Sequence, residues 1–275
     1  MTPDPRYRPL TVRRVWTIHG AVALVVAATA AAALLAHVPG LFAVPGAVIG
    51  VEVGVWIWLS RRAGRIVQRM GDNAILVEQG EYARAAPQLD ALADEARLIP
   101  NLHALITQRR ADVHFACGEL DAAEALALAV SDSGWLARPS SALYVAYPKL
   151  CALLAVIAAL RDRPEIVATW EARSRGAVTD ARKGTLAFMD AILAARAHRF
   201  SEITKLELVA APRPYGAVLH WVIAYATAQT PSARDRLTSR TDAARAATAE
   251  ALALAPYWPE LAAFVAGSQQ IGATC

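Results

Sequence analysis

Two long stretches near the start of the chain carry almost no charge, and they constrain the fold more than any other feature. Residues 16–38 contain no Asp, Glu, Lys or Arg. At about 1.5 Å of helical rise per residue, this stretch covers the roughly 30 Å hydrocarbon core of a bilayer. After Pro39-Gly40, residues 41–60 form a second apolar stretch in which Glu52 is the one charged residue. The short connection predicts an antiparallel pair of membrane-spanning helices.

The flanking charges predict the orientation of this pair. Residues 1–15, a basic N-terminus, and residues 61–70, a basic juxtamembrane linker, each supply four arginines, whereas the Pro39-Gly40 loop has none. Basic residues favour the cytoplasmic side, so both ends of the chain are expected there. A cleaved signal peptide also begins with basic residues, but its apolar run is shorter and no second span follows it. We therefore favour a transmembrane hairpin that lies in the bilayer.

The charge distribution also bears on possible partners. The first 70 residues contain eight arginines against two acids, whereas the rest of the chain has a small acidic excess. The formal charge of +4 is therefore a topology signal and does not indicate a nucleic-acid-binding surface. Arginine far outnumbers lysine and alanine is abundant, as in proteins from GC-rich bacterial genomes. We expect a protein of the bacterial inner membrane that does not bind nucleic acid.

Small residues and one acid mark the second span. Gly46, Gly50 and Gly54 recur at every fourth position, a pattern that lets another helix approach closely. That helix is either the first span or a partner, including a second copy of this chain. Glu52 lies near the middle of the span, where a carboxylate is costly. It is expected either to form a structural hydrogen bond with Thr29 or to act in proton transfer or contact with a partner helix.

The remainder of the chain lacks strand signals. Alanine- and leucine-rich segments of helical periodicity, separated by short breaks, extend over residues 71–265 and precede a C-terminal tail at residues 266–275. This pattern predicts an all-α domain. The three cysteines, Cys117, Cys151 and Cys275, have no metal-binding or CxxC spacing, so neither a metal nor a disulfide framework is expected.

A short motif occurs twice in this region. The sequence GEYARA starts at Gly80, and GELDAA starts 38 residues later at Gly118. Glycine ends one helix in a left-handed conformation, the acid favours the next N-terminus, and small alanines allow close helix crossing. The residues that carry the motif are Gly80, Tyr82, Ala85, Gly118, Leu120 and Ala123. They resemble the turn of a tetratricopeptide repeat, and residues 161–164, 198–200 and 229–231 resemble degenerate versions of it.

The resemblance implies a fold and a class of function. Tetratricopeptide-like chains form an α-solenoid, here of about four to five helix-turn-helix units, and serve as scaffolds that bind other proteins. A generic helical bundle is the structural alternative. The chain has no phosphate-binding loop, HExxH, GxSxG or paired-cysteine motif, so neither an enzyme nor a cofactor is expected. We expect a membrane-anchored scaffold or assembly factor; the alternative is a small subunit of a membrane complex that acts through Glu52 and the glycine face.

Overall fold

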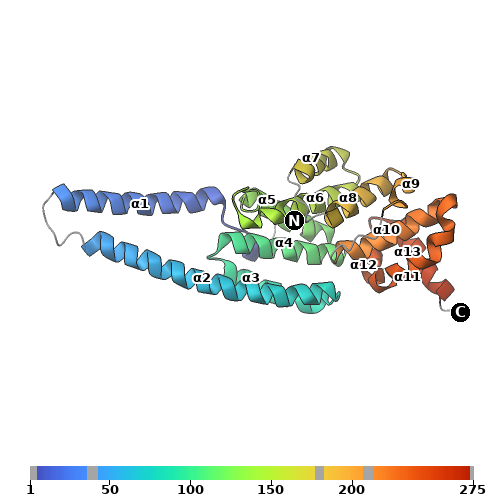
Figure 1. Ribbon diagram of the computed structural model, residues 1–275, viewed down its shortest axis with the longest axis horizontal. Coiled ribbons are helices and arrows are strands. Elements are labelled where there is room, and N and C mark those ends of the chain that lie inside the picture. Colours follow the sequence, from blue (N-terminus) through green and yellow to red (C-terminus); the bar gives the residue numbers. More distant parts are fainter. Residues whose placement is uncertain (1–4, 36–42, 177–182, 207–212, 273–275) are drawn as a thin grey trace.

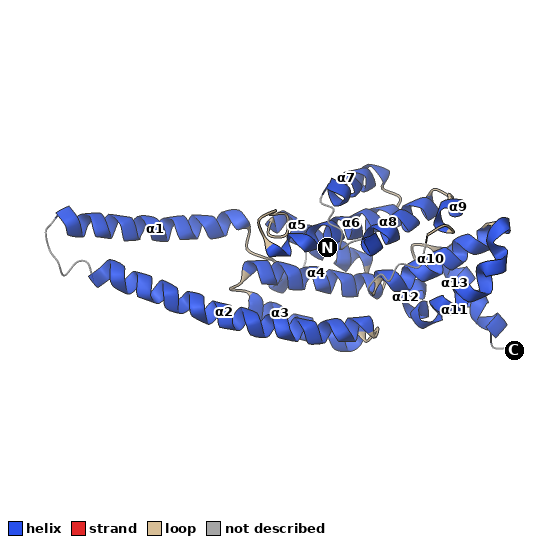
Figure 2. Ribbon diagram, viewed as in Figure 1, coloured by secondary structure: helices blue, strands red, loops and turns tan. Residues whose placement is uncertain are grey.

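The computed structural model describes residues 5–35, 43–176, 183–206 and 213–272. Helices account for most of these residues, and no strand occurs among them (Figure 2). Alanine, leucine and arginine, which dominate the sequence, have the highest helix propensities. The prediction of an all-α protein is therefore confirmed.

The helices follow one another with short connections. The α-helices are α1 (Val12–Leu35), α2 (Ala43–Glu78), α3 (Tyr82–Ala96), α4 (Pro100–Ala116), α5 (Leu120–Ser133), α6 (Tyr147–Leu160), α7 (Pro164–Gly176), α8 (Lys183–Arg196), α9 (Phe200–Ile203), α10 (Tyr215–Gln229), α11 (Leu237–Ala244), α12 (Thr248–Ala253) and α13 (Pro259–Gly272). Short 3₁₀ turns occupy Pro5–Tyr7, Ala142–Ala146, Pro231–Arg236 and Arg245–Ala247. We use the term helical domain for the second half of α2 together with α3–α13.

The hairpin projects from one end of the helical domain. α1 and the first half of α2 leave this end together and run antiparallel to each other (Figure 1). Bulky apolar side chains on both helices are exposed, among them Leu24 (72%) and Val51 (67%). An exposed apolar surface of this extent is unfavourable in water and suits a lipid environment.

Two helical stretches of the described residues are long and apolar enough to cross a membrane, Val12–Ala32 and Ala142–Leu160. The first is not buried in the protein, as a lipid-facing helix requires. Most of the second is buried, because α6 lies in the core of the helical domain. We therefore assign the first to the predicted first span and the second to the protein core.

The predicted second span belongs to a longer helix. Its residues from Ala43 onward form the first half of α2, and the predicted Pro39-Gly40 loop lies outside the described residues. α2 then continues without a break through residues 61–70, which the sequence indicated as a linker. One helix of 36 residues thus runs from the hairpin into the helical domain (Figure 1).

The second half of α2 packs as an ordinary core helix. Ile66 and Val77 are buried among the apolar side chains of the domain. Buried Asn73 donates a hydrogen bond of 2.9 Å from Nδ2 to the carbonyl oxygen of Ala85 on α3. These contacts fix the direction in which α2 leaves the domain.

The segment before α1 is fixed in the same way. Tyr7 is buried and its hydroxyl group bonds to Asp90 on α3. His103 Nε2 donates to the carbonyl oxygen of Arg6 over 2.7 Å, and Trp135 Nε1 donates to the carbonyl oxygen of Leu10. The basic N-terminus is thus docked on the helical domain, and both helices of the hairpin are held at their base.

Four helix pairs share one turn geometry. In each, a residue with positive φ ends the first helix: Gly80 (78°), Gly118 (76°), Asp162 (53°) and His198 (57°). The N–H of that residue donates to the carbonyl three residues earlier, and the next N–H donates to the carbonyl five residues earlier. This is the Schellman pattern of helix termination. The turn predicted at residues 229–231 differs, because Thr230 there is extended.

The motif residues lie at contacts between helices. Ala85, Ala123 and Leu120 are fully buried. The hydroxyl of Tyr82 donates to buried Glu250 on α12 over 2.9 Å, although the two residues are 168 positions apart. α12 therefore packs back against the turns of the first two helix pairs.

The core is built around α6 and α10. Rings of Phe115, Phe188 and Tyr215 pack together with centroids 5.1–6.1 Å apart, joining α4, α8 and α10. Buried Asp112 accepts hydrogen bonds from the Tyr215 hydroxyl and from Lys149 Nζ, the latter over 2.7 Å. A buried carboxylate is stable only with such partners, so this group ties α4, α6 and α10 together.

Gly118 provides a test of the turn geometry. A Cβ at this position would overlap the carbonyl oxygen of Ala253, and the positive φ disfavours any side chain. We expect Gly118→Ala to lower the free energy of unfolding by about 2 kcal/mol or more. The measurement is chemical denaturation of the full-length protein in detergent. The matched control is Gly71→Ala in α2, where an added Cβ meets no atom within 4 Å; it should be neutral or stabilise by about 0.5–1 kcal/mol. Equal effects of the two variants would contradict the turn assignment.

His103 makes the docked N-terminus sensitive to pH. Burial lowers the pKa of His103, and its hydrogen bond to the carbonyl of Arg6 only partly offsets this. At low pH the unfolded state therefore binds more protons at His103 than the folded state does. The contribution of His103 to stability is fully present above its unfolded pKa of about 6.5, and it is lost as the pH falls below that value. We expect faster hydrogen exchange of residues 6–10 at pH 5.5 than at pH 7.5, after correction for intrinsic rates. His103→Gln, which keeps an N–H donor, should weaken this dependence; an unchanged dependence would exclude His103 as its source.

Candidate protein-binding groove

A groove separates α7 from α8. Both helices pack against α6 (Figure 1), and two hollows of about 490 and 560 Å³ lie along their facing sides. The two hollows share Val167, Glu171 and Leu193, so they form one elongated groove. Each volume lies within the range of about 300–1,000 Å³ that is typical of binding pockets.

The floor of the groove is apolar. Val167 from α7 and Leu193 from α8 are half-buried and line both hollows. Ala191, Ala194 and Ile203 extend the apolar lining toward α9. Ala191, Ala194 and Ile203 are themselves buried, so the exposed apolar surface of the floor comes mainly from Val167 and Leu193.

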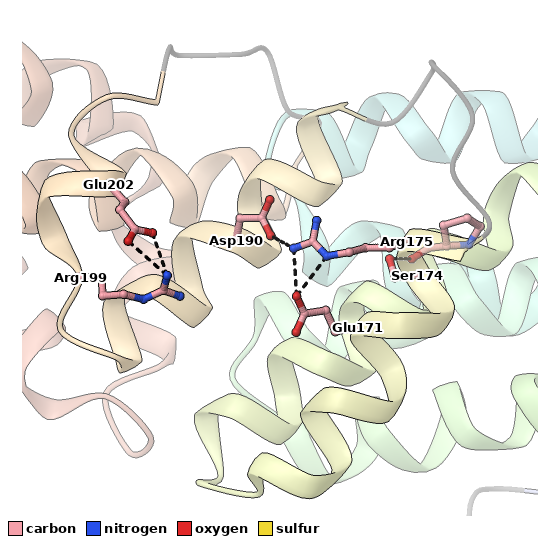
Figure 3. Close-up of polar contacts among 7 residues, drawn as sticks. Glu171, Ser174, Arg175, Asp190, Arg199 and Glu202 are labelled. Atoms are coloured by element: carbon pink, nitrogen blue, oxygen red, sulfur yellow. Dashed lines mark hydrogen bonds and ion pairs between the residues drawn. The ribbon is translucent and has the colours of Figure 1, made fainter.

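Charged side chains form the rim. Arg175 on α7 bonds to Glu171 on its own helix over 3.0 and 3.1 Å and to Asp190 on α8, which bridges the groove at one point (Figure 3). Burial opposes the charge of Arg175, but its hydrogen bonds to the two carboxylates outweigh this and raise its pKa. The ion pair thus joins two helices that otherwise meet mainly through α6.

The remaining rim charges are also paired. Arg199 bonds to Glu202 over 3.0 and 3.2 Å beside the end of α8 (Figure 3), and Arg196 pairs with Asp162 in the turn before α7. The charges on the rim balance one another. The groove therefore combines an apolar floor with charged groups of both signs, and its rim favours neither a strongly acidic nor a strongly basic ligand.

No signal in the sequence indicates the groove. The sequence of α7 is that of an ordinary polar helix. The groove forms because α7 and α8 both pack against α6. The exposed position Ala168 lines the groove, whereas its exposed neighbour Thr169 does not. Only the packing of the helices distinguishes the two.

The predicted intramembrane residues lie on α2. An added Cβ at Gly50 or Gly54 would meet no atom of the described residues within 4 Å, so no described side chain of α1 packs closely on this part of the glycine face. Gly46 lies in the first turns of the same helix, and its surroundings are outside the described residues. Packing within the hairpin, the simpler interpretation, therefore has no described contact to support it at Gly50 and Gly54.

Glu52 does not pair with Thr29. The Thr29 hydroxyl donates to the backbone carbonyls of Val25 and Val26 in α1, each over 3.0 Å, so the expected structural hydrogen bond is absent. Glu52 is exposed and lines a shallow hollow of about 370 Å³ with Val53 and Trp56. Among the described residues, no hydrogen bond or ion pair reaches its carboxylate.

Neither metal ligands nor similar proteins point to another site. Within residues 5–35, 43–176, 183–206 and 213–272, no three His, Cys, Asp or Glu side chains form a group that could hold a metal ion. Comparisons with protein-family models, with curated proteins and with solved structures found no match to this chain.

Proposed function

We propose that this protein is a membrane-anchored scaffold or assembly factor and that its helical domain binds a partner protein. The groove between α7 and α8 carries this proposal. Its apolar floor is open to solvent, it is elongated, and helices line both sides. An amphipathic helix of another protein fits these features, because such a helix places a row of apolar side chains in a groove and polar ones along the rim.

A tetratricopeptide-like solenoid is the architecture that we propose for the domain. Support comes from the four turns at Gly80, Gly118, Asp162 and His198, which share one hydrogen-bond pattern. Repeated helix pairs that stack on one another create extended surfaces for binding other proteins. The groove lies between the third and the fourth of these pairs.

We further propose that the hairpin spans the bacterial inner membrane with both ends of the chain in the cytoplasm. The arginines on both flanks and the exposed apolar surface of α1 and α2 support this location. The groove would then face cytoplasmic partners, and the lipid bilayer would be the second partner of the protein.

Photo-crosslinking tests the groove in native membranes. A photoreactive phenylalanine analogue placed at Ala168 should form an adduct with one partner protein, identified by mass spectrometry. The matched control places the same analogue at Thr169, one position along the helix but outside the groove, and should form little or none. Val167→Trp, which fills the groove, should reduce the Ala168 adduct at least ten-fold. Equal labelling from both positions, or no labelling from either, would exclude the groove as the binding surface.

An alternative function has its own support. Among the described residues, none covers Gly50 or Gly54 and none pairs with Glu52, so α2 could pack on another membrane helix, either from a partner protein or from a second copy of this chain. A carboxylate in hydrocarbon is costly without a partner, and such packing would provide one. The protein would then be a small subunit of a membrane complex.

Substitutions in α2 separate the two functions. We expect Gly50→Leu to disrupt a complex that depends on the glycine face, because the side chain blocks close approach. Glu52→Gln tests the carboxylate itself, and Val51→Leu at a neighbouring exposed position is the control. The measurement is native electrophoresis in mild detergent. Loss of the complex in Gly50→Leu with an intact Ala168 adduct favours the alternative, whereas unchanged complexes in all three variants exclude it.

A further inference from the structure

A group of arginines surrounds the base of the hairpin. Arg13 and Arg14 lie in the first turn of α1, and Arg61 and Arg65 lie in the middle of α2. All four side chains are exposed, and in the described part of the chain none has an acidic partner. We call these four residues the arginine collar.

Most described arginines beyond Gly80 have an acidic partner; the paired ones are Arg84, Arg97, Arg110, Arg161, Arg163, Arg175, Arg196, Arg199, Arg213 and Arg245. The four guanidinium groups of the collar have no such neutralising partner among the described residues, and an anionic ligand would supply one.

Tryptophans lie at the same level. Trp16 on α1 and Trp56 and Trp58 on α2 are exposed by 60%, 69% and 45%. Arg62 lies over the ring of Trp58 at 5.1 Å, and Arg138, from the segment after α5, lies over Trp16 at 5.8 Å. Tryptophan prefers the headgroup region of a bilayer, so these side chains place the collar at the membrane surface.

The collar has a fixed position relative to the helical domain. On one side, the carbonyl of Leu10 accepts a hydrogen bond from Trp135 just before α1 begins. On the other, Arg62 Nε in α2 donates to the carbonyl of Glu95 over 2.9 Å. Leu98, which is 62% exposed, follows three residues after Glu95 at this same end of the domain. The end of the domain therefore lies beside the collar and faces the same surface.

We infer that the arginine collar binds the phosphate groups of anionic phospholipids and thereby holds this end of the helical domain against the membrane. Guanidinium groups form paired hydrogen bonds with phosphate oxygens, and basic clusters next to a span attract anionic lipids. This inference rests on the membrane anchor of the proposed function and is independent of the groove between α7 and α8.

Native mass spectrometry of the full-length protein in detergent tests the inference. We expect phosphatidylglycerol to bind at least ten-fold more tightly than phosphatidylcholine. Arg61→Gln/Arg65→Gln should weaken binding of phosphatidylglycerol by roughly 30-fold, at about five-fold for each arginine, and leave binding of phosphatidylcholine unchanged. The control, Arg234→Gln/Arg236→Gln, removes two exposed arginines from the 3₁₀ turn directly before α11. α11 lies at the end of the helical domain away from the hairpin (Figure 1), so this variant should have no effect. Millimolar inorganic phosphate should not displace the lipid.

Three results would overturn the inference: equal binding of the two lipids, equal effects of the two double variants, or displacement by inorganic phosphate, which would indicate a free phosphate ligand. Flotation with vesicles separates this failure from failure of the anchor. Protein that floats with vesicles of either lipid but shows no preference retains the anchor and contradicts the collar. Protein that floats with neither contradicts both.

Discussion

The uninterrupted backbone of α2 is the constraint on which the rest of the structure depends. The first half of α2 carries exposed apolar side chains, and its second half packs in the helical domain. The backbone hydrogen bonds of one continuous helix therefore connect the hairpin to the helical domain. A second attachment, through Tyr7 and the carbonyl groups of Arg6 and Leu10, holds α1. With both helices held, the domain cannot rotate freely about the hairpin. A partner bound in the proposed groove would therefore have a defined orientation relative to the hairpin.

Beyond α2, the order of the helices depends on how each one ends. Each of the four turns contains one residue of positive φ and forms the same two backbone hydrogen bonds. The two helices of each pair are therefore joined by the same turn geometry. At Gly118 the backbone also approaches Ala253 of the segment that ends α12, so the C-terminal helices pack on the first turns. This contact brings distant parts of the chain together. It requires glycine because a Cβ would overlap the carbonyl oxygen of Ala253, in addition to the requirement of the turn for a positive φ.

Much of the fold could be predicted from the sequence, because its signals are local. Apolar length identifies α1 as a helix long enough to cross a membrane, and the two glycine motifs locate their turns to the residue. From the sequence, a linker is expected at residues 61–70 because of its four arginines. The helix continues there instead, since arginine has a high helix propensity. Asp162 and His198 lack the glycine signal, yet the structure gives them the same left-handed role. The groove could not be predicted, and neither could the lack of a partner for Glu52 among the described residues, because both depend on how helices pack. Thr29, the expected partner, bonds to the backbone of its own helix instead.

A distance measured along α2 tests the central claim most directly. Spin labels at Val55 and Ile75, both exposed on α2, should be attached to the full-length protein in lipid bilayers after replacement of Cys117 and Cys275. An unbroken helix predicts a narrow distance distribution centred near about 30 Å between the two backbone sites, widened only by the label linkers. A broad distribution, or one centred well below this value, would show a break between hairpin and helical domain and would contradict the account.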